Sequence, residues 1–299
     1  MNLNATPFFR LTSHLLDLLQ VLEGQEIPLI IVGGFGLALR YQHIAESGEQ
    51  TLLTPIPRVR TTEDIDAFLR LDLLANVEKM IFLKEKLSEL GYQVVPEARN
   101  YQFTKPDTAT DNQRNVKIDL LTRKPGEGDP QLRYDSRRVS SKAKSPLHGR
   151  ITPEAIAVED TPLELPIEGN NTRDELTNGF VYLPHPYALL LLKLFAFRDE
   201  QLGKKPEDRT LYARKHAGDL YAILAMTTEA EYAAFEIFKA KYGTTDIGNE
   251  ASQIVQDFFQ DQTSAGALQV REAHRETTPA NLETFLNLLK ATFNSVFEG

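Results

Sequence analysis

The architecture of this chain follows from two neighbouring stretches, PLIIVGGFGLALRY at residues 28–41 and RTTEDIDAFL at residues 60–69. In the first stretch, a short β-branched apolar run lies between a proline and the glycines Gly33 and Gly34, and it predicts a buried strand. The apolar spacing that follows predicts the start of a helix. A strand, a glycine turn and a helix place backbone amides around a helix N-terminus, which is a site suited to phosphate.

The second stretch supplies carboxylates. Asp64 and Asp66 stand two residues apart in a segment, residues 65–69, that is typical of a strand. Side chains at this spacing point to one face, so the two can share a cation. Neighbouring carboxylates repel unless a divalent metal or a proton lies between them, and Mg²⁺ bridging to phosphate oxygens is the usual solution. For an isolated D-x-D pair, two solvated acids at a strand edge would be the favoured interpretation.

The combination resembles the nucleotidyltransferase superfamily of the polymerase-beta type. Its signature is Gly-Gly or Gly-Ser at a strand end, a helix, an Asp-x-Asp pair on the next strand, and a third Asp on a later strand. Here these are Gly33-Gly34, Asp64-Ile65-Asp66 and Asp119 within the apolar run 116–121. The pattern G-G-x-x-L-A-L-R-Y followed by R-T-T-E-D-I-D is most similar to AbiEii-type abortive-infection toxins. The segment over 43–57 is longer than in that group, and an extra loop there could alter which acceptor fits.

The resemblance implies an α+β fold: a nucleotidyltransferase-fold mixed sheet with flanking helices, followed by a C-terminal helical domain. Because nearly everything beyond residue 180 has helical spacing, we expect a catalytic domain over 1–180 and a helical domain over 181–299 that completes the nucleotide cleft. In the family, a K-x-x-x-x-R…K-x-x-x-D-L pattern faces the glycine turn. The residues that match this pattern are Lys193, Arg198, Lys215 and Asp219, with Lys193 as the triphosphate contact. Arg60 either contacts the nucleotide or pairs with Glu63.

The implied activity is transfer of a nucleoside monophosphate from an NTP to an acceptor hydroxyl, with Mg²⁺ or Mn²⁺ and release of pyrophosphate. Asp64, Asp66 and Asp119 would be the catalytic and metal-binding residues, and Asp119 would draw the proton from the attacking hydroxyl. Relatedness to AbiEii-type toxins implies an RNA acceptor, such as a tRNA end, and a separate antitoxin protein as partner. The alternatives are a small-molecule or protein acceptor, or an inactive nucleotide-binding regulatory module.

Charge gives two opposed indications. The net charge of −9 over 299 residues argues against broad, nonspecific coating of nucleic acid. Six basic residues nevertheless cluster around a single acid, Asp135: they are Arg133, Arg137, Arg138, Lys142, Lys144 and Arg150. Charge alone favours a solvated, mobile loop. Beside a phosphate-handling site, the same segment becomes a candidate for contact with a nucleic-acid acceptor or with nucleotide phosphates.

Other site classes are disfavoured. The chain contains no P-loop, its glycines lack the third position of a dinucleotide fingerprint, and it has no cysteine. We see no signal peptide, and the apolar run 187–197 is interrupted by Lys193, so we expect a cytoplasmic protein without a membrane segment.

The remaining expectations concern secondary structure: helices over 11–22, 36–46, 72–90, 187–201, 211–226, 229–242, 254–259 and 282–297, and strands over 28–32, 65–69, 92–95, 101–104, 116–121, 155–158, 163–167 and 181–183.

Overall fold

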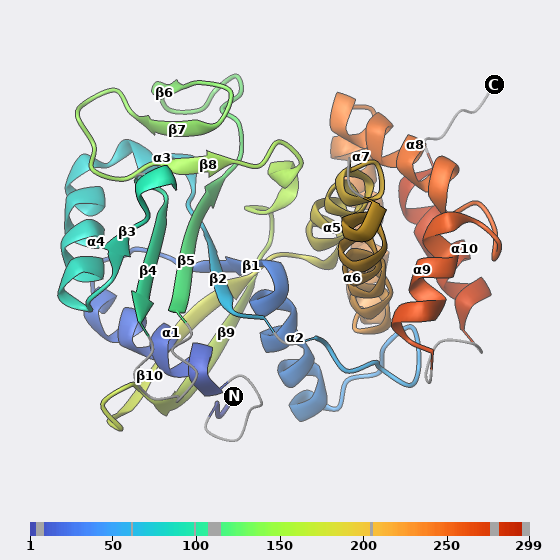
Figure 1. Cartoon of the computed structure of the whole chain (residues 1–299), viewed down its shortest axis with the longest axis horizontal. Coiled ribbons are helices and arrows are strands. Elements are labelled where there is room, and N and C mark those ends of the chain that lie inside the picture. The colour runs from blue at the N-terminus through green and yellow to red at the C-terminus, as the bar shows by residue number, and fades with distance from the viewer. Residues whose placement is uncertain are drawn as a thin grey trace. The chain divides into compact units, whose positions relative to one another are not determined.

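The computed structural model of the chain describes residues 1–3, 9–60, 62–98, 100–106, 115–203, 206–275 and 281–294. It divides into two compact units (Figure 1). Unit 1 comprises Met1–Glu46, Arg60–Pro153 and Glu159–Pro184, and unit 2 comprises Ser47–Val59, Glu154–Val158 and His185–Gly299. The sequence predicted two continuous domains that meet at residues 180/181, whereas two short internal segments join unit 2 before the final crossing at Pro184.

Unit 1 is built on a mixed sheet. Within the described residues its strand order is β6-β7-β8-β5-β2-β1-β10-β9, with β4 paired to β5 and β3 paired to β4. The pairs β1/β10, β2/β5 and β5/β8 are parallel and the others are antiparallel, as expected for an α+β fold. The strands are β1 (Ile30–Val32), β2 (Asp64–Phe68), β3 (Gln93–Val94), β4 (Gln102–Pro106), β5 (Asn115–Thr122), β6 (Leu132–Tyr134), β7 (Arg138–Ser141), β8 (Gly149–Ile151), β9 (Leu163–Asn170) and β10 (Leu176–Leu183).

Strand β5 shows how the sequence fixes the faces of the sheet. Val116, Ile118 and Leu120 are buried, while Lys117 between them is exposed and Asp119 is half-buried. Because successive side chains of a strand alternate between faces, the apolar set faces the core and the polar set faces away from it. One face of the sheet at β2 and β5 is therefore available for polar chemistry.

The helices of unit 1 are α1 (Phe9–Leu22), α2 (Gly33–Ser47), α3 (Leu71–Ala75), α4 (Val77–Glu89) and the short 3₁₀ helix η1 (Pro96–Ala98). Helix α1 packs on β2, β9 and β10. The single helix expected over 72–90 is interrupted at Asn76. The Asn76 side chain accepts a hydrogen bond from the backbone N–H of Lys79 at 3.0 Å. This bond caps the N-terminus of α4. Asn76 therefore marked a helix start in the sequence, but the apolar spacing continues across it and predicted a single helix.

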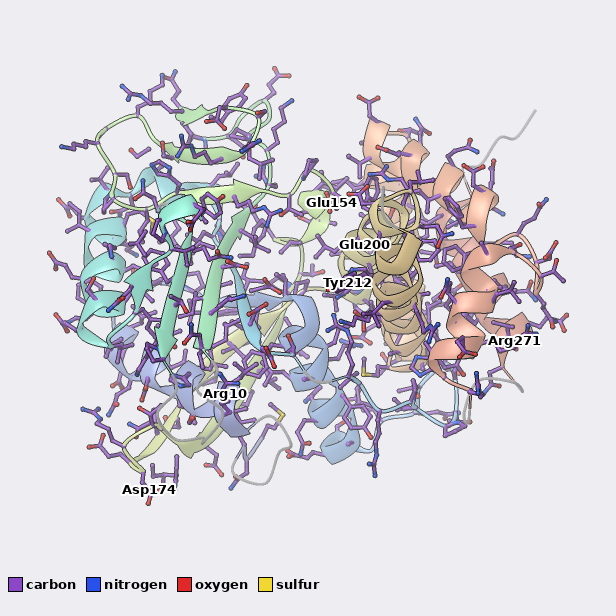
Figure 2. All side chains as sticks on the ribbon, in the orientation of Figure 1. Arg10, Glu154, Asp174, Glu200, Tyr212 and Arg271 are labelled. Carbon is purple, nitrogen blue, oxygen red and sulfur yellow. The ribbon has the colours of Figure 1, made fainter. Side chains whose placement is uncertain are left out.

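Two further segments differ from the expectations. The strands expected over 163–167 and 181–183 are longer, since the first extends to Asn170 and the second begins at Leu176, and they form the antiparallel β9–β10 hairpin with Asp174 at its tip (Figure 2). The strand expected over 155–158 is the 3₁₀ helix η2 (Ala155–Ala157), which belongs to unit 2 and contacts α5 there. A four-residue apolar run carries no periodicity that separates a strand from a buried helical turn.

Unit 2 consists of η2 and helices: α5 (Pro186–Gln201), α6 (Pro206–Ala225), α7 (Glu229–Tyr242), α8 (Asp246–Phe258), α9 (Ala265–Ala273) and α10 (Leu282–Phe293). Helix α5 begins with a proline, which suits the first helical position. It is buried on nearly all sides, which explains its continuous apolar run. None of the helices in the described part of the chain has the length and apolar character required to span a bilayer.

The insertion over 43–57 has two parts. Its first residues extend α2 to Ser47, and most of the remainder lies in unit 2. There the backbone N–H of Leu52 donates to the Thr227 carbonyl at 2.9 Å, and the Asn281 side-chain amide donates to the Thr54 carbonyl at 2.6 Å. The insertion is thus anchored to the helices of unit 2.

Candidate active site

The glycine turn after β1 has a conformation that only glycine accommodates easily. Gly33 is the first residue of α2 and has a φ of +67°. Its neighbour Val32 pairs with Asp66 on β2, and a Cβ built on Gly33 would overlap Asp66 Oδ2. The left-handed backbone of this residue and the close approach of the Asp66 side chain together explain why the position is occupied by glycine. The turn and the acid predicted from distant parts of the sequence are therefore in direct proximity.

Arg60 also lies at this turn. A Cβ built on Gly34 would lie 3.5 Å from Arg60 Nη2 and 3.1 Å from the Thr62 side chain. Arg60 therefore lies beside the N-terminus of α2. The sequence had left open whether it contacts the nucleotide or pairs with Glu63. A guanidinium at a helix N-terminus adds positive charge where backbone amides already favour an anion.

The strand register brings the predicted acids to one face. Strand β2 runs parallel to β5, with Asp66 opposite Asp119 and Asp64 opposite Lys117. Residues opposite one another on neighbouring strands share a face, and their Cβ atoms lie roughly 5 Å apart. Asp64, Asp66 and Asp119 therefore form an acidic group on the face away from the core, next to the Gly33 turn.

The carboxyl group of Asp119 is perturbed by its surroundings. Burial raises the pKa of its carboxyl above the usual value, and the charge of Asp64 adds to this rise, whereas a hydrogen bond from the Gln102 side chain and the charges of Arg150 and Lys117 oppose it. Its Oδ1 atom is buried and has no hydrogen-bond partner among the described residues. A raised pKa and an unsatisfied acceptor are typical of a functional carboxylate.

Two further residues adjoin Asp119: Gln102, which the sequence did not reveal, and Arg150, which the sequence placed only in the basic cluster. Gln102 on β4 pairs directly with Asp119, and Arg150 on β8 pairs with Leu121, two residues further along β5. Both contacts depend on the pairing of separate strands. For Gln102 the only local signal was the strand expected over 101–104, and a strand pattern fixes the relative faces of its residues but not their partners.

The acids carry the donor atoms that Mg²⁺ or Mn²⁺ prefers. Among the described residues, however, no group of three or more His, Asp or Glu side chains is gathered tightly enough to hold a metal ion. The shared face and the unsatisfied Oδ1 of Asp119 fit a cation, so the residues are compatible with a metal site.

Unit 2 contains the cations that the resemblance assigned to the nucleotide. Lys193 Nζ lies 2.7 Å from Asp219 Oδ2, and the two residues are 5% and 4% exposed. Arg198 pairs with Asp199 at 2.7 Å and also with Glu250. Lys215 Nζ lies 4.6 Å from the centre of the Tyr212 ring. In this conformation each of these cations is satisfied by a neighbour within its own unit.

A cavity of about 780 Å³ in unit 1 lies elsewhere. Its lining comes from α1, the segment before β1, α3, α4 and β10, and it includes none of the predicted site residues. Pro28 lines this cavity whereas Gly33 follows β1, so the cavity and the acidic group lie at opposite ends of that strand. The candidate active site is therefore distinct from this cavity.

No protein-family model and no curated protein sequence matches the chain. Among solved structures it is similar to the antibiotic-resistance factor ANT(2'')-Ia in solution, with 13% identity and a TM-score of 0.34, over 79% of this chain and 100% of the other. A crystal structure of ANT(2'')-Ia in complex with adenylyl-2''-tobramycin aligns with 14% identity and a TM-score of 0.33, over 78% of this chain and 99% of the other. At these TM-scores the likeness does not assign an activity to the chain.

The Gly33 turn leads to a specific prediction. We expect Gly33→Ala to lower the nucleotidyl transfer that the resemblance implies by about 10²-fold, because the new methyl group displaces the Asp66 carboxylate. Gly128→Ala is the matched control: Gly128 also has a positive φ, +84°, but a Cβ there meets nothing within 4 Å. Both variants should lose about 1–2 kcal/mol of unfolding free energy through backbone strain. Equal loss of transfer in both variants would contradict a positional role for Gly33.

Proposed function

We propose that this protein is a metal-dependent nucleotidyltransferase that moves a nucleoside monophosphate from an NTP to an acceptor hydroxyl. The observation that carries the proposal is the register that sets Asp66 opposite Asp119 while the Asp66 carboxylate lies against Gly33. Phosphate-binding amides and cation-binding carboxylates then stand side by side, which is what phosphoryl transfer requires. Intact acids at all three positions argue against an inactive nucleotide-binding module.

Each residue has a role that follows from its place. Backbone amides of Gly33 and Gly34, with Arg60 beside them, would hold the β- and γ-phosphates. Asp64 and Asp66, with Asp119, would hold the divalent metal. When bound, this metal supplies positive charge that stabilises the attacking and leaving oxygens. The nucleotide contacts that we propose for unit 2 are Lys193, Arg198, Lys215 and Asp219. On nucleotide binding, Lys193 would give up its ion pair with Asp219 and bind a phosphate.

The reaction would proceed by in-line displacement. The Asp119 carboxylate takes the proton of the acceptor hydroxyl, whose oxygen forms a bond to the α-phosphorus. The bond from that phosphorus to the bridging oxygen of the β-phosphate breaks, and pyrophosphate leaves with the electron pair.

The finer assignment concerns the acceptor. We propose an RNA acceptor, as the AbiEii-type resemblance implies, and a separate antitoxin protein as partner. The support for RNA is the group of exposed basic residues on the strands β6, β7 and β8 that follow the acidic group. A small-molecule or protein acceptor is the alternative, with the same chemistry and the same acids.

A labelling experiment tests the proposal. The purified protein is incubated with Mg²⁺, each α-³²P-labelled NTP in turn, and total bacterial RNA, with a chelator and the Asp64→Asn variant as controls. We expect label in RNA only with the unmodified protein and only with metal. Label on protein or on an added small molecule would retain the chemistry and change the acceptor. No label in any fraction, with each class of acceptor supplied, would overturn the proposed function.

A further inference from the structure

The basic segment between Gln131 and Arg150 is ordered structure and not the mobile loop that its charge suggested. Residues 132–134, 138–141 and 149–151 form β6, β7 and β8, which continue the sheet outward from β5 (Figure 1). Their inner face is apolar: Leu132, Val139 and Gly149 are buried, and a Cβ on Gly149 would lie 3.1 Å from Leu74 of α3. The three strands are therefore a packed platform that holds its outer side chains in place.

Register places three arginines on the outer face. Arg150 pairs with Leu121 of β5 and with Arg138 of β7, and Arg133 of β6 pairs with Ser140, two residues from Arg138. Side chains alternate along a strand, so Leu121 shares the face of Asp119, and the three arginines share it too. We call Arg133, Arg138 and Arg150 the basic row. With strands about 4.8 Å apart, it extends roughly 14 Å outward from β5.

The basic row is available for an anionic partner. All three arginines are exposed. Arg138 pairs with Asp135 at 3.2 Å, whereas Arg133 and Arg150 form no ion pair within the described part of the chain. Arg150 is close enough to Asp119 to lower the pKa of that carboxyl, so the inner end of the row adjoins the acidic group. The row is thus a line of positive charge that leads to the proposed catalytic base.

We propose that the basic row binds the backbone of a single RNA strand whose terminal hydroxyl is presented to Asp119. This inference rests on the proposed function, because it assigns the acceptor of that same site. A linear, polyanionic ligand matches a linear row of guanidinium groups, which bind phosphate in a fixed geometry. A cationic small acceptor would be repelled by the same row. The net charge of −9 disfavours unspecific RNA binding over the rest of the surface.

The test is binding without catalysis. A short fluorescein-labelled single-stranded RNA is titrated by anisotropy in chelator and without NTP, at several salt concentrations. Three phosphate contacts predict a slope of log K against log salt of about −2, or about 20-fold weaker binding between about 50 and 200 mM salt. The variant Arg133→Gln/Arg138→Gln/Arg150→Gln should bind weakly and lose most of that slope. The milder Arg133→Gln/Arg138→Gln variant should reduce the magnitude of this slope by about 1.4.

The matched control removes the same charge from another part of unit 1. Arg70, Lys86 and Arg173 each pair with a surface carboxylate, and changing all three to Gln should leave the slope intact. Three results would overturn the inference: an unchanged slope in both basic-row variants, an equal loss in the control, or equal binding of labelled poly-glutamate of matched charge. RNA binding without any nucleotidyl transfer would instead overturn the proposed function, and transfer to another acceptor without RNA binding would overturn the inference alone.

Discussion

Asp66→Asn is expected to lower nucleotidyl transfer by about 10³-fold. Asn has nearly the shape of Asp, so it fits beneath Gly33 without displacing the turn, yet it lacks the charge that a divalent cation requires. Loss of about 4 kcal/mol of transition-state stabilisation corresponds to that factor. The measurement is single-turnover transfer of label from α-³²P-NTP at saturating Mg²⁺.

The fold and the metal can be examined in the same variant. Mg²⁺ should raise the melting temperature of the unmodified protein, because a ligand that binds only the native state stabilises it, and this rise should be much smaller for Asp66→Asn. Glu85→Gln, which changes an exposed acid on α4, is the control and should retain both the rate and the rise. Undiminished transfer by Asp66→Asn would show that the metal-site assignment is wrong.

Lys193→Met is expected to lower the free energy of unfolding by about 3–5 kcal/mol. The substitution leaves the Asp219 carboxylate without its ion-pair partner at a position that is 4% exposed. An uncompensated buried charge costs this much in proteins where one partner has been removed. Chemical denaturation followed by far-ultraviolet circular dichroism measures the change.

A double-mutant cycle separates the ion pair from simple packing. Asp219→Asn alone should also destabilise the protein, whereas Lys193→Met/Asp219→Leu should recover much of the loss, because no charge is then left buried. The exposed pair Lys86 and Glu89 is the control, and removal of either member should change stability by less than about 1 kcal/mol. Additive losses in the cycle would mean that Lys193 and Asp219 act independently.

The face that carries the acidic group was predictable because each of its elements has a local sequence signal. The apolar run before Gly33, the helical spacing after it and the Asp64-x-Asp66 pair each identify an element without knowledge of its partners. The family resemblance then linked them to Asp119, and the register of β2 with β5 brings Asp66 and Asp119 together.

The remaining features depend on contacts that are distant in sequence. Strands β6 to β8 are only three or four residues long, and their pattern is too short to distinguish them from a loop. Strand pairing alone places Gln102, and the Arg150 of the basic cluster, near Asp119. Helix α9 has weak apolar spacing and was missed, and η2 takes its conformation from its contact with α5.

The five passages of the chain between the units make the protein indivisible by simple truncation. A fragment that ends at Pro184 would still carry the segments Ser47–Val59 and Glu154–Val158, with Leu53, Ala157 and Val158 stripped of the neighbours that bury them. Exposed apolar surface of this kind promotes aggregation. Truncation at Pro184 therefore does not isolate a self-contained unit 1, and a shortened form of the protein has to keep the segments of both units.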